Sequence, residues 1–200
     1  MRHTSDGVAI DYLAIAILRQ NDHVVMVRQQ IPHDDRSYWV LPGGLVEAGE
    51  LVVDALIREA QEEAGVQITA IAHLACCSQI DLPARRAQTV AFIFEVETWQ
   101  GTLSHHDPDA EVVEVELVAW NEAIHRLEQN GGWAGIQAPL LAYLRGTAPA
   151  GTFWFYREDT EGQQLIASVP AGDRASMSFP HVSSGNPIWV EDSYIQGIPD

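Results

Sequence analysis

The residues best suited to chemistry in this 200-residue chain are three glutamates close together, Glu59, Glu62 and Glu63. On a helical wheel of about 100° per residue, all three fall within one arc, and the apolar residues of the same stretch form a separate face that suits a core. Glu59 and Glu63 are an i, i+4 pair whose repulsion costs about 0.2–0.5 kcal/mol. Carboxylates that converge in this way suit a hard divalent cation, which takes oxygen ligands and keeps several waters.

Two features beside the glutamates bear on this interpretation. Gly43 and Gly44 carry no side chain, so backbone carbonyls can approach the same cation. Arg58 can relieve part of the repulsion through its own i, i+4 pairing with Glu62. The alternative is a solvated acidic face of a helix, which is the usual explanation of an acidic run.

The stretch from Gly44 to Val66 resembles the signature of a known family, the Nudix hydrolases. It matches every fixed position of that signature, in the order Gly44-x5-Glu50-x7-Arg58-Glu59-Ala60-x-Glu62-Glu63-x-Gly65-Val66. The resemblance implies an α/β fold, an α/β/α sandwich around a mixed β-sheet, over roughly residues 8–145. It does not extend to the C-terminal part of the chain.

In chemical terms, the resemblance implies hydrolysis of a pyrophosphate linkage in a nucleoside diphosphate joined to another group, with Mg²⁺ or Mn²⁺ as cofactor. Arg58 would orient Glu59, and Glu50 would help to order the loop and the helix. The implied metal ligands are the side chains of Glu59, Glu63 and, directly or through water, Glu62, together with the carbonyl of Gly43.

The general base is expected outside this signature, on the loop that spans residues 104–111. Glu111 is the first candidate and Glu114 the second. The alternative for the two histidines of this loop, His105 and His106, is that they have no catalytic role. Asp107, which precedes a proline, can simply shape the turn.

The substrate is less sharply indicated. ADP-ribose or another sugar nucleotide is favoured, partly because Gln29 and Gln30 weakly resemble polar strand-end residues of sugar-nucleotide hydrolases. A nucleoside triphosphate or a dinucleoside polyphosphate is the alternative substrate. A non-catalytic nucleotide sensor of the same fold is the alternative of another class, although no glutamate of the signature is missing. Candidate substrate contacts are Trp39, Arg85 and Arg86. A solvated loop explains the two arginines equally well, and core packing is the commoner role of a residue such as Trp39.

Composition narrows the range of partners. The formal net charge is -17, with 28 acidic residues against 11 arginines and no lysine. Such a chain is not expected to bind nucleic acid or an anionic membrane, because both need clustered cations. A small nucleotide remains a possible ligand if a divalent cation lies between the acidic protein and the phosphates.

The adjacent Cys76 and Cys77 favour buried thiols over a disulfide. The lack of a signal-peptide pattern favours a cytoplasmic location.

The pattern of apolar residues and turns predicts a mixed sheet with helices packed on it. A polar turn at residues 20–22 separates the first two strands, Gly65 is expected to cap the first helix, and Asn121 to begin the second. Strands are expected over residues 8–18, 23–28, 38–41, 67–78, 88–99 and 111–120, and helices over 51–64, 121–129 and 137–145.

The chain changes character after residue 146, so residues 1–146 are expected to form the Nudix domain and 147–200 a β-like C-terminal extension. Phe153, Trp154, Phe155 and Tyr156 would place aromatic rings on both faces of a strand. Both faces would then need to be covered, by the same domain or by a partner subunit. We therefore expect this extension to contribute to a homodimer.

Overall fold

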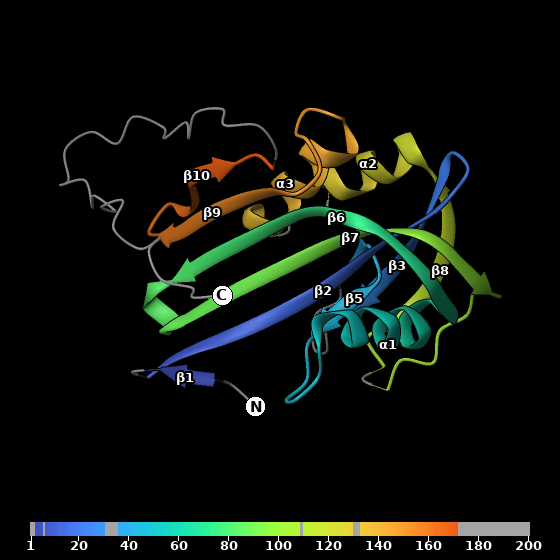
Figure 1. Cartoon of the computed structure of the whole chain (residues 1–200), viewed down its shortest axis with the longest axis horizontal. Helices are drawn as coiled ribbons and strands as arrows, with labels where there is room; N and C mark the ends of the chain where they lie inside the picture. Colours follow the sequence, from blue (N-terminus) through green and yellow to red (C-terminus); the bar gives the residue numbers. More distant parts are fainter. Residues whose placement is uncertain (1–2, 6, 31–35, 109, 130–132, 172–200) are drawn as a thin grey trace, which may run out of the picture.

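The computed structural model describes residues 3–5, 7–30, 36–108, 110–129 and 133–171. In this part of the chain, ten strands join into a mixed sheet that carries helices on both faces (Figure 1). The strands are β1 (His3–Ser5), β2 (Val8–Gln20), β3 (His23–Gln30), β4 (Ser37–Val40), β5 (Gly43–Leu45), β6 (Val66–Leu82), β7 (Ala87–Gly101), β8 (Val112–Ala119), β9 (Thr152–Asp159) and β10 (Gly162–Val169). The helices are α1 (Val52–Ala64), α2 (Trp120–Gln129) and α3 (Ala134–Leu144), with a 3₁₀ turn at Pro83–Arg85.

The order of the sheet is β10-β9-β6-β7-β2-β3-β4, while β1 and β5 also pair with β2, and β8 pairs with β3. The pairs β2–β7 and β6–β9 are parallel and the others are antiparallel. Strands β2 and β3 pair only at their shared turn, through Arg19 with Val24 and Gln20 with His23. The first hairpin therefore splays apart beyond its turn, where β5 pairs with β2.

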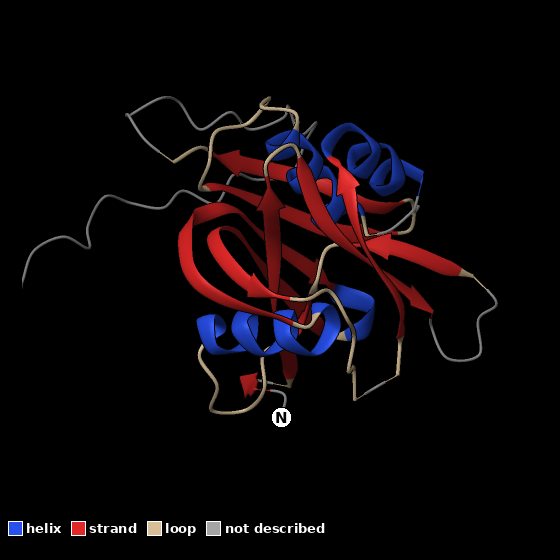
Figure 2. Cartoon of the chain, turned by 90° about the vertical axis from the view of Figure 1, so that its right-hand side faces the viewer, coloured by secondary structure: helices blue, strands red, loops and turns tan. Residues whose placement is uncertain are grey.

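Alternation along β2 divides the core into two layers. Ala14, Ala16 and Leu18 pack with α1, whereas Ile17 points to the opposite face and packs with α2 and α3. Successive residues of a strand face opposite sides, so one apolar strand can serve both layers. Figure 2 shows α1 and the other two helices on opposite sides of the strands. The predicted α/β/α sandwich around a mixed sheet is confirmed.

Most of the predicted elements form close to their expected bounds, and the differences have local causes. Asn121 does not cap α2, which begins one residue earlier at Trp120. The backbone N–H of Trp120 donates to the carbonyl of Asp22 (2.8 Å), and its indole N–H to the carbonyl of Leu144 (3.1 Å). These tertiary hydrogen bonds fix the start of the helix. The short strand β5 was not expected because two of its three residues are glycines.

The described part of the C-terminal extension adds strands to the main sheet. β9 pairs in parallel with β6, and β10 pairs with β9. Trp154 and Tyr156 pack on the side of α3, beside Ile80 and Ile136. The division at residue 146 remains a prediction, and residues 172–200 of the extension lie outside the described part of the chain.

Two smaller expectations can be compared with the structure. Cys76 and Cys77 are both buried and free, and burial raises the pKa of each thiol to about 12. This agrees with the prediction of buried structural thiols. Among the helices that the structure describes, none combines the length and the apolar character needed to cross a membrane.

Candidate active site

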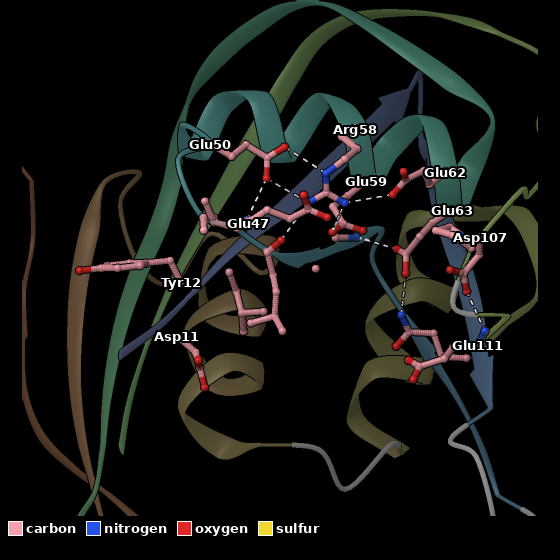
Figure 3. Close-up of a pocket in the computed structure, with 18 of the residues that line it drawn as sticks. Asp11, Tyr12, Glu47, Glu50, Arg58, Glu59, Glu62, Glu63, Asp107 and Glu111 are labelled. Carbon is pink, nitrogen blue, oxygen red and sulfur yellow. Dashed lines mark hydrogen bonds and ion pairs between the residues drawn. The ribbon is translucent and has the colours of Figure 1, made fainter. Parts of the chain in front are cut away.

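Helix α1 is fixed at its C-terminal end by Gly65 and by the loop that follows β7. Gly65 adopts the left-handed conformation (φ 71°), and its N–H donates to carbonyls of the last turn. The backbone N–H groups of Ser104 and His106 donate to the carbonyls of Ala64 (3.1 Å) and Glu62 (2.7 Å). This loop therefore satisfies carbonyls at the end of the helix, and it carries Asp107 and Glu111 toward the helical glutamates (Figure 3).

Arg58 binds three carboxylates at once. Its guanidinium donates to both oxygens of Glu50 (3.0 and 3.1 Å), to Glu59 Oε1 (2.7 Å) and to Glu62 Oε2 (3.0 Å). A further bond reaches the carbonyl of Leu45 (2.9 Å), which ties the helix to β5. The bonds to Glu50 are the main reason that the pKa of Arg58 is raised and that the pKa of Glu50 is lowered.

Glu63 is held differently, at the buried end of the same helical stripe. It is 5% exposed, and its two oxygens accept hydrogen bonds from the Gln29 side chain (2.7 Å) and from the backbone N–H of Gly43 (2.7 Å). Both bonds favour the carboxylate, but burial outweighs them and raises the pKa of Glu63 to about 8. Nearby Glu59 and Asp107 raise it further.

Glu59 lies between these two ends, against the glycine pair. A Cβ on Gly44 would lie 2.5 Å from a carboxylate oxygen of Glu59, and a Cβ on Gly43 would lie 2.4 Å from the carbonyl oxygen of Ala14. Gly43 therefore requires glycine, because the backbone that it faces cannot move aside, whereas a side chain at position 44 would displace the carboxylate of Glu59. Burial raises the pKa of Glu59 despite the bond to Arg58.

These residues line one pocket of about 950 Å³. It is bordered by eight acidic side chains and one basic side chain, Arg58. Figure 3 shows the glutamates of α1 on one wall, Asp11 and Tyr12 of β2 on another, and Asp107 and Glu111 on a third. A pocket with this charge cannot attract a phosphate chain without cations.

The donor set fits a hard divalent cation. Glu59, Glu62 and Glu63 supply carboxylate oxygens, and the carbonyl-bearing Gly43 lines the same pocket. Arg58 takes one oxygen of Glu59 and one of Glu62, so each keeps a second oxygen. Within the described residues, no three Asp, Glu, His or Cys side chains converge closely enough to hold an ion as they stand. Binding would therefore require these side chains to rotate toward one another.

The candidates outside the helix separate into two groups. Glu111 lines the pocket, and its backbone N–H donates to Asp107 Oδ2 (2.7 Å), so Asp107 shapes this turn. Glu114 does not line the pocket and forms an ion pair with Arg28 (2.7 Å). His105 and His106 are exposed and do not line the pocket either.

The three candidate substrate contacts are also away from this pocket. Arg85 lies 3.8 Å from Glu158 and over the ring of Trp133. Arg86 is the left-handed residue that follows the 3₁₀ turn. Trp39 packs against the core beside α2, with Arg126 over its ring.

Sequence reasoning missed some residues of the pocket, among them Asp11, Tyr12 and Glu47, and the bond between Gln29 and Glu63. Apart from the weak strand-end resemblance of Gln29, no sequence signal marked them, because β2 and β3 reach α1 only through the fold.

A second, more apolar pocket of about 570 Å³ adjoins the first and shares Asp11, Leu13 and Gln29 with it. Its other walls include Tyr38, Trp133 and Leu140.

A sequence model of the NUDIX domain matches residues 11–144. This chain therefore belongs to the Nudix family, as the spacing of its glutamates indicated. The match covers the three helices, strands β3 to β8 and most of β2, whereas β1, β9 and β10 lie outside it.

The similar proteins are named for different activities. The 8-oxo-dGDP phosphatase NUDT18 of Mus musculus is 31% identical over 102 residues, which are 50% of this chain and 29% of that protein. The ADP-ribose pyrophosphatase of Haemophilus influenzae is 34% identical over 100 residues, 46% of this chain and 45% of that one. The chain spans only about three tenths of the length of the mouse and human NUDT18 proteins.

Solved structures agree on the fold. The MutT protein from Bacillus halodurans superposes with a TM-score of 0.59 at 17% identity, covering 80% of this chain and 97% of that one. At this identity the similarity shows the fold alone.

Proposed function

We propose that this chain is a metal-dependent hydrolase that cleaves a pyrophosphate linkage in a nucleotide derivative. The observation that carries the proposal is the single pocket that brings the three glutamates of α1 together with Glu111. Membership of the Nudix family and relatives named as phosphatases and pyrophosphatases support it. Because the chain covers only part of those relatives, their named activities serve as support alone.

The residues of the chain would divide the work as follows. Glu59, Glu62 and Glu63 would hold Mg²⁺ or Mn²⁺, with the carbonyl of Gly43 as a further ligand. Such an ion, when bound, neutralises phosphate oxygens and lowers the pKa of a water molecule. Arg58 would act as a positioning residue, because it already orients Glu59 and Glu62 through hydrogen bonds.

Glu111 is the general base in this proposal. It would accept the proton of the attacking water at a carboxylate oxygen, which requires a position within reach of the substrate. Its place on the pocket wall supports that role. Glu114 is the weaker candidate because it is engaged by Arg28 outside the pocket.

For the substrate we favour a nucleoside diphosphate joined to a second group, such as ADP-ribose or another sugar nucleotide. The acidic pocket, with its cations, suits the phosphate chain, and the adjoining apolar pocket suits a planar base. A nucleoside triphosphate or a dinucleoside polyphosphate remains the alternative, and the relatives named for 8-oxo nucleotides favour including oxidised nucleotides in any test.

The proposal is tested by measuring product release from a panel of these nucleotides by chromatography, with Mg²⁺, with Mn²⁺ and with EDTA. We expect turnover of at least one substrate in the presence of metal and none in EDTA. Activity that survives chelation would refute metal dependence. Tight calorimetric binding of a nucleotide without turnover would instead favour the non-catalytic sensor.

A further inference from the structure

The apolar pocket beside the candidate active site contrasts in charge with the acidic one. Its walls include residues of β2, β4, β5, α2 and α3, and Asp11 is the only Asp, Glu, Arg, Lys or His among the described residues that line it. Asp11 also lines the acidic pocket, where Figure 3 shows it on β2, across from Glu62 and Glu63. A ligand that spans both pockets would therefore pass this carboxylate.

Two glutamines of this pocket are held with their amide nitrogens turned to other partners. The side-chain amide of Gln29 donates to Glu63 (2.7 Å), and that of Gln137 donates to the backbone carbonyl of Leu127. A carbonyl can only accept, and so can an ionised carboxylate, so the partners fix which amide atom is the nitrogen. Each glutamine therefore offers its carbonyl oxygen to a ligand as an acceptor.

The other polar side chains of the pocket change this balance little. The hydroxyl groups of Tyr38 and Thr89 can donate or accept. The indole N–H of Trp133 is a donor, but this residue is 42% exposed. The rings of Tyr38 and Trp133 supply flat apolar surface for a heterocycle. The acceptors with a fixed role, on Asp11 and the two glutamines, therefore outnumber the fixed donors.

We propose that this pocket selects a purine nucleotide whose base carries an exocyclic amino group, with Asp11 as the specificity-determining residue. An amino group supplies N–H donors, and a carboxylate can only accept them. A carbonyl oxygen at the same place would leave the acceptors of the pocket without donors, which lowers affinity. The inference rests on the proposed function, because it places the phosphate chain in the acidic pocket.

A different role for Asp11 makes a different prediction. As one of eight acidic side chains around the acidic pocket, it would add to the attraction for a cation. Removal of its charge would then weaken the binding of every nucleotide alike, whatever its base. The two roles are therefore separated by comparing bases, and not by the size of the loss for one nucleotide.

The test measures the dissociation constants of AMP, GMP and IMP by calorimetry, with the full-length protein and saturating Mg²⁺. These nucleotides share the ribose and the phosphate, and IMP differs in having no amino group on its base. None of them contains a pyrophosphate linkage, so binding is measured without turnover. Asp11→Asn removes the charge at nearly constant volume. Asp54→Asn, at an exposed aspartate of α1 that lines neither pocket, is the matched control.

We expect IMP to bind at least about tenfold more weakly than whichever of AMP and GMP binds more tightly, because it lacks the hydrogen bonds of the amino group. In Asp11→Asn the difference should shrink to about threefold or less, because an asparagine amide can donate to the carbonyl oxygen of hypoxanthine. Asp54→Asn should keep the full difference.

The proposal would be overturned by IMP binding as tightly as both other nucleotides, or by a protein that binds none of the three. Equal weakening of all three by Asp11→Asn would overturn the role of Asp11 in favour of cation attraction. Selective binding without turnover in the substrate panel would refute the hydrolase and not the selectivity, whereas turnover without selective binding would do the reverse.

Discussion

The glutamates at the two ends of α1 are held in opposite ways, and the first of them, Glu50, lies just before the helix begins at Val52. At the start of the helix, Glu50 shares both oxygens with Arg58, and its pKa is lowered. At the end of the helix, Glu63 is buried beside neutral donors, and its pKa is raised to about 8. Glu50 thus has a resident cationic partner that holds the loop, whereas Glu63 is held by neutral donors, and in our proposal it receives a cation from solution.

The largest expected effect on kcat comes from replacing Glu63, the buried glutamate at the end of α1. Glu63→Gln preserves volume and removes an anionic ligand, so we expect kcat to fall by about 10²–10⁴-fold. The free energy of unfolding of the metal-free variant at neutral pH should change little, because a carboxyl group with a pKa of about 8 is mostly protonated there and glutamine has nearly the same volume. Both are measured on the purified variant by steady-state kinetics and thermal unfolding, with Glu97→Gln, at an exposed glutamate of β7, as the control. A variant that unfolds but keeps full turnover per folded molecule would show that Glu63 is structural.

The next largest effect on kcat is expected from replacing Glu111, on the loop that packs against the end of α1. Glu111→Gln should lower kcat by about 10²-fold or more and remove the acidic limb of the pH–rate profile, whereas Glu114→Gln should change kcat little. The profiles are measured at saturating metal. Small and equal losses from both changes would move the base into the helix itself.

At the other end, Glu50→Gln should mainly reduce stability. It weakens the charge-assisted bonds to Arg58, which we expect to lower the free energy of unfolding by about 1 kcal/mol. The effect on kcat should be smaller than that of Glu63→Gln. Chemical denaturation measures the first quantity and initial rates the second, and the reverse order of effects would contradict the distinction between the two ends.

The smallest effect is a slope of stability with pH in metal-free buffer. Glu63 has a pKa of about 8 in the folded chain and an ordinary value of 4.5, so the folded state binds more protons between these values. Its contribution to stability is complete below about pH 4.5 and is lost as pH rises toward 8. Denaturation midpoints of the wild type and Glu63→Gln in EDTA, compared across this range, isolate the slope. Parallel curves would show that Glu63 ionises normally.

The parts of the site that sequence could predict are those carried by one local element. Glu59, Glu62 and Glu63 lie on a single helix, so their spacing alone places their side chains on one stripe. The capping role of Gly65 follows from the same local geometry. Most of the strands were predictable because each is a local apolar run bounded by turn residues, and the sandwich followed from the family resemblance.

The parts that could not be predicted depend on contacts between distant segments. Gln29 reaches Glu63 because β3 passes beside α1, and nothing near residue 29 encodes that approach. Arg85 and Arg86 were candidates as adjacent cations, yet they lie on a turn away from the acidic pocket. Adjacent charge in sequence says little about position relative to a pocket formed by other strands.

The hydrogen bonds from Ser104 and His106 to the last turn of α1 have a kinetic consequence. They join the segment that carries Glu111 to the end of the helix that carries the other glutamates, and we infer that the two walls move together. The glutamate side chains rotate when a metal ion binds, but no loop then has to close over the substrate. We therefore expect the observed rate of substrate association to rise linearly with concentration in stopped-flow experiments, without the plateau that a preceding conformational change produces.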